Sequence, residues 1–434
     1  MLYSVMIDGT TPNLIAFYLA TVKHMGGTDA QLQAAWTAHE HYQTPLDVDI
    51  ETDDPTPWGF GRADLVDVFR TYYGRRLIAP GMSLQDNLVN TLLCNGTSSP
   101  PLWTGLFGLY GLPLVHLSDA LEVQTAVYAK QALALAASNL DSGLSCLFSE
   151  IVGESSRRRE AMAAAISSSL APHSLHRSPP LPFCVPPSPQ NAAGERRSPL
   201  DILESLAFDG RLSNLPLDLP GYFDHGLYGG RHWSSLPEIR DAVLACTWQW
   251  GALDTVQSDS VPGALDALEE LGRTAVVLAC GTHKPGDVEF DFYLCFLVTL
   301  VYSLRTVLVS LQCYGAVQVH AADLVRCLWA MFVLVYILQL RPKMDVALLG
   351  TPRPRHEPTS NQFREFRADL GLALPKHQDP FYLRTLRSMA GLAACERDRG
   401  WQILINNAAS KFRQGWRRWI GFQPSEGVSM NVRI

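Results

Sequence analysis

Proton transfer and metal binding in this sequence depend chiefly on its 12 histidines, because imidazole titrates near neutral pH and is a common metal ligand. His116 lies in the apolar segment GLPLVHLSDALE, at the start of an expected helix, and is predicted to face the interior. A buried histidine is more often a core residue than a catalyst. His116 is therefore a candidate general acid or base with a structural alternative.

The other histidines give weaker signals. His39 and His41 are two residues apart, so a helix would place them on different faces and they would not share a metal. His283 lies in GTHKPGDVEFDFYL, beside a Pro-Gly turn. Four more lie in expected loops: His173, His176, His225 and His232.

Asp291 precedes a strongly apolar segment. A carboxylate at the mouth of a buried helix is costly unless it is paired. Asp291 is therefore expected to cap that helix or to belong to a site, and the cap is the simpler reading.

Several classes of protein are disfavoured by what the sequence lacks. It has no G-x-G-x-x-G after a strand, no G-x-x-x-x-G-K-[ST], no G-x-S-x-G and no H-E-x-x-H. The nine cysteines form no C-x-x-C pair, which argues against zinc and a disulfide framework. A net charge of -7, with scattered Lys and Arg, argues against nucleic acid as a partner.

Apolar residues recur at helical spacing in Leu14–Lys23, Leu32–Tyr42 and Leu117–Leu140, and Pro262 opens a further such segment. Strand signals are sparse. The sequence therefore predicts an all-α fold, formed as one large body over residues 1–434. A Pro/Ser-rich stretch at 167–199 is expected to be a long insertion loop or linker within it.

Two segments are apolar on all sides, Phe292–Leu304 and Cys327–Leu340. The longer has 14 residues, short of the roughly 18 to 20 that span a bilayer. Both are predicted to be buried central helices, with a membrane hairpin as the alternative. The start MLYSVMIDGTTPN lacks the features of a secretory signal, so a cytoplasmic location is expected.

Local patterns together resemble the questin oxidase-like family, fungal enzymes that tailor aromatic polyketides by oxidative ring opening. The matching segments are LQAAWTAHEHYQTP, LYGLPLVHLSDALE, GTHKPGDVEFDFYLCFLVT, YILQLRPKMD and, more weakly, YLRTLRSM. They follow the family's order and span most of the chain. The resemblance implies an all-helical oxidoreductase of the oxygenase type, with a buried pocket for a flat polycyclic substrate, molecular oxygen as oxidant and NADPH as reductant.

The resemblance also suggests site residues. His116, Asp291 and Tyr293 are the expected catalytic group, with His116 as general acid or base and the other two as its helpers. The substrate pocket is expected to include Phe17, Tyr18, His283, Phe296 and Arg384. Cofactor-binding residues are not assigned.

The sequence departs from the family where the family carries histidines. Leu14, Phe17 and Tyr18 stand in the positions of its first histidine-rich helix, Cys295-Phe296 stand where another histidine is expected, and Arg384 replaces a lysine. Only His116 is kept. One imidazole cannot hold iron against water, so no metal ligand is assigned and an iron site is not expected.

Three functions follow as hypotheses. The first is an oxidoreductase acting on a polycyclic aromatic polyketide in fungal secondary metabolism. The second is a metal-free cyclase or isomerase that reuses the same pocket, which Leu and Phe make more apolar. The third is a non-catalytic binding member. The expected partner is a small molecule; its identity and the oligomeric state do not follow from the sequence.

Overall fold

The computed structural model describes residues 6–7, 11–40, 59–78, 81–94, 101–170, 197–213, 215, 233–253, 260–283, 290–350 and 380–415. Helices make up nearly all regular structure in these ranges. The strands found there are β1 (Met6–Ile7) and β2 (Thr11–Pro12), which form one short antiparallel pair. The predicted all-α fold in one helical body is confirmed.

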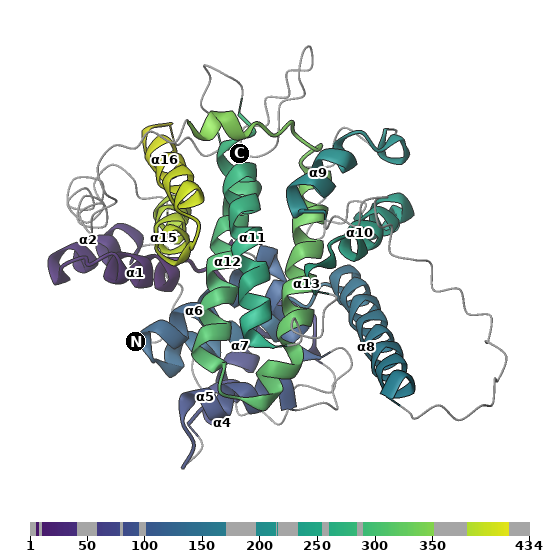
Figure 1. The fold of residues 1–434 in the computed structure, drawn as a ribbon. Helices are drawn as coiled ribbons and strands as arrows, with labels where there is room; N and C mark the ends of the chain where they lie inside the picture. Colours follow the sequence, from purple (N-terminus) through teal and green to yellow (C-terminus); the bar gives the residue numbers. More distant parts are fainter. Residues whose placement is uncertain are drawn as a thin grey trace.

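Three long helices form the centre of the molecule: α11 (Val261–Cys280), α12 (Phe292–Leu311) and α13 (Gly315–Leu338). They stand side by side and pack against one another (Figure 1). By length and composition, α12 and α13 could cross a membrane, with mean hydropathies of 2.0 and 1.9. Both are largely buried within the protein. This agrees with the prediction of buried central helices at the two apolar segments.

Side-chain caps set where two central helices begin. Ser260 accepts a hydrogen bond from the Gly263 amide at the start of α11, where Pro262 occupies the first turn. Asp291 accepts one from the Leu294 amide, 3.0 Å away, at the start of α12. The capping interpretation of Asp291 is therefore confirmed.

The segment Leu117–Leu140, expected to form one helical stretch, is divided into α6 (Leu112–Val123) and α7 (Ala126–Ser138). Gln124 ends α6 in the left-handed conformation, with φ of 55°. The side chain of Thr125 then accepts a hydrogen bond from the Val127 amide and caps α7. Local capping therefore interrupts an apolar periodicity that is nearly continuous.

The remaining helices surround the centre. On one side, α1 (Ile15–His24) and α2 (Asp29–His39) lie near α15 (Pro380–Cys395) and α16 (Arg399–Gly415), and on the other lie α8 (Ser142–Leu170), α9 (Pro199–Ala207) and α10 (Pro237–Gln249) (Figure 1). The short elements are α4 (Val66–Arg76), α5 (Leu84–Val89), the π-helix η3 (Asn90–Cys94) and the 3-10 helices η2 (Ala63–Leu65), η4 (Leu102–Phe107), η5 (Leu109–Gly111), η6 (Gly210–Leu212), η8 (Trp233–Ser235), η9 (Gly251–Leu253) and η11 (Val346–Leu349).

The Pro/Ser-rich stretch was predicted over residues 167–199, and these bounds are too wide. Helix α8 continues to Leu170, and Pro199 is the first residue of α9, which Ser198 caps. A proline fits the first turn of a helix because its missing N–H has no partner there. His173 and His176, within 171–196, and His225 and His232 lie outside the described residues.

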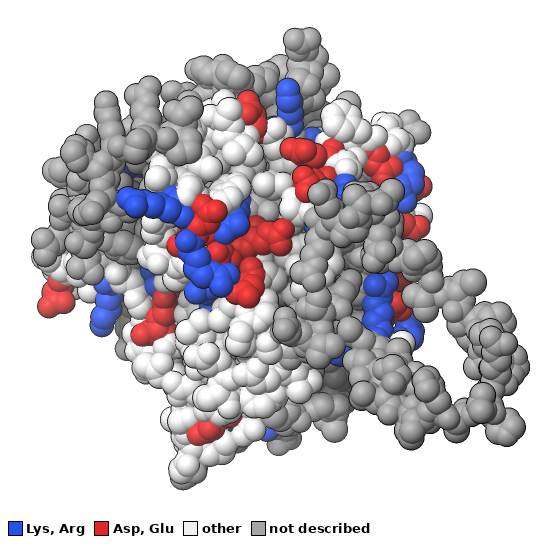
Figure 2. All heavy atoms as spheres, in the orientation of Figure 1, with Lys and Arg blue, Asp and Glu red and all other residues white. Residues whose placement is uncertain are grey.

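On the surface, basic and acidic side chains lie close to one another. Figure 2 shows acidic and basic residues together near the middle of one face, above a broad uncharged area. Ion pairs crossing from α11 to the connection between α15 and α16 include Arg273 with Glu396 and Arg397 with Glu269.

The close approach of η4 to α7 gives a stability prediction. A Cβ on Gly105 would lie 2.1 Å from the backbone oxygen of Ala136, which cannot move aside easily. Gly105→Ala is expected to lower the free energy of unfolding by about 1 to 3 kcal/mol, measured by denaturant titration. Gly153→Ala, where a Cβ meets nothing within 4 Å on α8, is the control and should be neutral or stabilising. Equal effects of the two changes would contradict the prediction.

Candidate functional site

His116 lies in the second turn of α6 and its side chain is fully buried. The sequence predicted this inward orientation. Neither ring nitrogen has a hydrogen-bond partner among the described residues. A buried imidazole normally satisfies at least one nitrogen, so an unpartnered one points to a binding or reaction site.

Aromatic rings from three helices form a chain of contacts that begins at His116. The ring of Phe17 on α1 meets the imidazole edge to face, at 6.4 Å between centroids. Phe381 on α15 lies 5.5 Å from Phe17, and also contacts Phe292 and Phe296 of α12 at 4.7 and 5.6 Å. We call Phe17, Phe292, Phe296 and Phe381 the aromatic cluster. It offers flat apolar surface beside the histidine.

A buried charge network joins α6 to α15. Asp119, one turn after His116, hydrogen-bonds to Nη1 of Arg384, and neither side chain is exposed. Arg387 hydrogen-bonds to Glu122 and lies 3.6 Å from Asp119. The guanidinium of Arg384 also lies over the ring of Phe17, 5.6 Å from its centroid. Arg384 therefore connects the charge network to the aromatic cluster.

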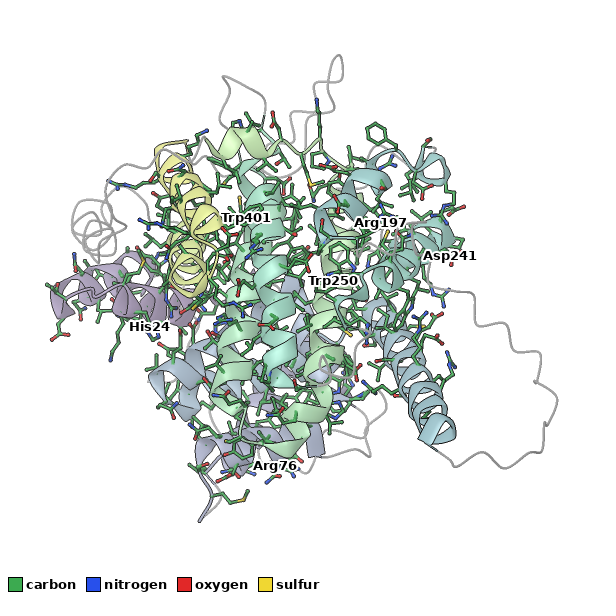
Figure 3. The ribbon with its side chains drawn as sticks, viewed as in Figure 1. His24, Arg76, Arg197, Asp241, Trp250 and Trp401 are labelled. Atoms are coloured by element: carbon green, nitrogen blue, oxygen red, sulfur yellow. The ribbon has the colours of Figure 1, made fainter. Side chains whose placement is uncertain are left out.

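Helices α1 and α12 complete the network. His24, labelled in Figure 3 on α1, has its Nε2 3.5 Å from Glu122. The hydroxyl of Tyr302 on α12 donates to the other oxygen of Glu122, at 2.9 Å. A Cβ on Gly391 of α15 would lie 2.2 Å from the Tyr302 ring, so glycine allows this tyrosine to reach between the helices.

Burial dominates the electrostatics of these groups. Desolvation, aided by Arg384, lowers the pKa of His116 to about 3. Desolvation, aided by Arg387, lowers the pKa of His24 to about 4 despite the nearby Glu122. Desolvation raises the pKa of Asp119 even though Arg384 and Arg387 oppose the shift. Both histidines are therefore neutral at physiological pH.

These shifts predict a loss of stability in acid. The pKa of His24 falls from 6.5 in the unfolded chain to about 4 in the fold, so the unfolded chain binds more protons between these values. Its contribution is present above pH 6.5 and is lost as pH falls towards 4, at up to about 1.4 kcal/mol per pH unit. We expect His24→Gln to flatten the dependence of unfolding free energy on pH in this window, measured by urea denaturation from pH 4 to 7. An unchanged slope would contradict the assignment.

Further polar atoms in the same helices lack partners. Besides His116, the unpartnered buried atoms include Asp119 Oδ2, Arg384 Nε and Nη2, and the hydroxyls of Thr299, Ser303 and Ser388. Phe292, Phe296, Thr299 and Ser303 follow the spacing of one face of α12. Ser388 is one turn beyond Arg384 on α15. These unpartnered groups therefore continue along the faces of α12 and α15 that carry the aromatic cluster and Arg384.

The residues at His116 do not fit an iron centre. The family resemblance led us to expect histidines where Leu14, Phe17, Tyr18 and Cys295-Phe296 stand, and Leu14, Phe17 and Phe296 have no metal-binding atom. Tyr18 packs against His39, and the Cys295 thiol, whose pKa is raised well above its ordinary value by burial, lies 3.9 Å from the Ala279 carbonyl oxygen. Among the described residues, one group of three possible ligands occurs, His24, Asp119 and Glu122, whose donor atoms lie within 4.8 Å of one another. Arg384 and Arg387 already bind its two carboxylates, so an added cation would face two positive charges. No catalytic step is assigned to a metal here.

Within the described residues there is no strand followed by a glycine-rich helix start, the unit that commonly binds the phosphates of NADPH. A phosphate-binding turn needs a strand followed by a glycine-rich start of a helix. The strands β1 and β2 have two residues each, and no glycine separates β2 from α1. No step is assigned to this cofactor.

The other residues predicted from sequence take separate positions. Tyr18 stacks edge to face on His39, at 5.1 Å between centroids. Tyr293 is buried and contacts Tyr110 and Phe292, so it borders the aromatic cluster. His283 contacts Phe290.

Asp291 holds the start of α12, as described above, and His41 lies outside the described residues. A catalytic role for Asp291 or Tyr293 stays a prediction.

Sequence reasoning missed most of the charge network: His24, Asp119, Glu122, Tyr302 and Arg387. The sequence contains a pattern that indicates this network, because polar residues recur every three positions in an otherwise apolar helix: His116, Asp119 and Glu122. Arg384 and Arg387 show the same spacing on α15. Charged residues on the buried face of an apolar helix require partners, which makes such spacing informative.

A family model described as questin oxidase-like matches residues 11–389. A search of curated proteins gives no match.

Proposed function

Because the chain belongs to the questin oxidase-like family, whose name indicates oxidase activity, we propose that it is an oxidoreductase acting on a polycyclic aromatic polyketide in fungal secondary metabolism. The observation that carries the proposal is the buried, unpartnered imidazole of His116 beside the aromatic cluster. Flat rings bind well against aromatic side chains, and a few polar groups then fix their orientation.

The roles of the residues follow from their chemistry. Neutral His116 can accept a proton from a phenol or donate a hydrogen bond to a carbonyl. The positive charge of Arg384 attracts a negatively charged group of the substrate, in a site without exposed surface where this attraction is strong. A phenolate beside His116 also favours the imidazolium and so raises the pKa of that histidine from its low resting value.

The oxidant in this proposal is molecular oxygen, with NADPH as the reductant that the family resemblance implies. Entry of one oxygen atom into the substrate, with the other leaving as water, requires two electrons and two protons from a reductant and water. We propose a cytoplasmic location, in accord with a small-molecule substrate.

The test is conversion of hydroxylated anthraquinones and anthrones by the purified full-length protein. We expect a product that contains one atom of 18O when the reaction is run under 18O2, detected by mass spectrometry, and consumption of NADPH. Absence of both binding and conversion across these compounds would contradict the proposal.

A second function is favoured by a specific observation. Phe17 and Phe296, which stand where histidines were expected, belong to the aromatic cluster beside His116. A metal-free cyclase or isomerase would need only such a shaped surface and one or two hydrogen-bond donors. Conversion of the substrate at an unchanged rate without oxygen and NADPH would favour this function, and a strict requirement for oxygen would exclude it.

A further inference from the structure

Arg384 is only half satisfied although it is fully buried. Its Nη1 hydrogen-bonds to Asp119, but Nε and Nη2 have no partner among the described residues. Nε and Nη2 form one edge of the planar guanidinium and point the same way, as a two-pronged donor. An unpartnered buried charge is costly, so this edge marks a position for a ligand.

The geometry of this edge selects the chemistry of the ligand. Two parallel N–H donors match two oxygens in one plane, which is the arrangement of a carboxylate. A phosphate fits the same edge, but its second negative charge would be expensive to desolvate where Arg384 has no exposed surface. A carboxylate carries a single charge.

The two carboxylates near Arg384 leave one edge of its guanidinium unpaired. Arg384 and Arg387 face Asp119 and Glu122, and burial favours the neutral form of Asp119. Glu122 is engaged by Arg387 and by the hydroxyl of Tyr302. These carboxylate contacts therefore leave Nε and Nη2 of Arg384 without a partner among the described residues.

The surroundings of the edge favour an aromatic ligand. The ring of Phe17 lies under the guanidinium and connects it to Phe381 and to His116. A carboxylate attached to an aromatic ring system would therefore place its rings against the aromatic cluster.

We propose that the substrate is an aromatic polyketide that carries a carboxylate, and that Arg384 binds this carboxylate through Nε and Nη2. This inference rests on the proposed function, since it specifies the substrate of the same site. Arg384 acts as a binding residue, and it determines which members of the substrate class are accepted.

The test measures binding of matched probes to the full-length protein by equilibrium dialysis at pH 7. Anthraquinone-2-carboxylate and anthraquinone-2-carboxamide share their rings and differ in charge. We expect the carboxylate to bind about 50-fold more tightly to the wild type, and Arg384→Lys to reduce this preference to about 5-fold or less, because lysine keeps the charge and loses the paired donors. Arg326→Lys, a buried arginine of α13 that bonds to Ser155 and the Leu253 carbonyl, is the control and should keep the preference.

The outcomes separate the two proposals. Equal binding of both probes to the wild type would overturn the carboxylate assignment while supporting a polycyclic substrate. Tighter binding of neutral 1-hydroxyanthraquinone, lost in Arg384→Lys, would replace the carboxylate by a hydroxyketone and also overturn it. Binding of neither anthraquinone, with benzoate bound by the wild type and not by Arg384→Lys, would contradict the polycyclic substrate and support the role of Arg384.

Discussion

Asp119→Ala is expected to lower the free energy of unfolding by about 3 to 5 kcal/mol, the typical cost of leaving a buried charge without its partner. Asp119 and Arg384 have no exposed surface, and Asp119 is the hydrogen-bond partner of Arg384 within the described part of the chain. Its loss would leave the guanidinium desolvated and unpaired. Urea denaturation at pH 7, followed by circular dichroism, measures the change.

Two further variants separate charge from packing. Asp119→Asn keeps an oxygen that can accept from Arg384 and should cost less than alanine. The double variant Asp119→Ala, Arg384→Met should recover much of the lost stability, because a buried ion pair can be replaced by apolar side chains at little cost. Asp64→Ala, in the exposed pair of Asp64 with Arg62, serves as the control and should leave the denaturation midpoint unchanged. A loss in Asp119→Ala no larger than in this control would contradict the buried network.

His116→Gln is expected to lower kcat for the polyketide substrate by about 100-fold or more, the usual contribution of a positioned acid or base. Glutamine roughly preserves the size of the side chain and its hydrogen-bonding capacity, but it cannot take a proton at physiological pH. The rate of substrate consumption under saturating conditions measures the effect. Unfolding free energy is measured in parallel, so that a folded, inactive protein is distinguished from a destabilised one.

His320→Gln is a matched control for this experiment. His320 is a partly buried histidine of α13 that contacts Trp103, and burial lowers its pKa as it does for His116. Trp103 does not belong to the aromatic cluster, and we expect kcat to stay within about 2-fold of the wild type, since changes away from a site act mainly on stability. Full activity of His116→Gln would overturn the acid–base role of His116.

The fold class could be predicted because it depends on local patterns. Three- and four-residue apolar spacing, scarce strand signals and the two strongly apolar segments indicated buried helices, and α12 and α13 are such helices. Segments such as LYGLPLVHLSDALE pointed to the family that the model match then showed over residues 11–389. The burial of His116 followed from its apolar neighbours in α6.

Boundaries were less predictable. The end of α6 at Gln124 depends on a left-handed residue followed by a side-chain cap, both of which act within a few residues and leave the apolar periodicity almost intact. Helix α9 starts at Pro199 because proline is tolerated in the first turn of a helix. This start is hard to predict because Pro199 ends a proline-rich stretch whose composition indicates a loop.

The sequence by itself determined that this protein is helical, that it belongs to an oxidase-like family and that His116 faces inward. Only the tertiary structure decided that Asp119 and Glu122 meet Arg384 and Arg387 across 265 residues of chain. The physical reason is that apolar periodicity fixes which face of each helix is buried, whereas the partner of a buried charge depends on how distant helices pack. The structure likewise decided that Arg384 keeps two donors free beside the aromatic cluster, because pairing within a packed core cannot be read from spacing along one helix.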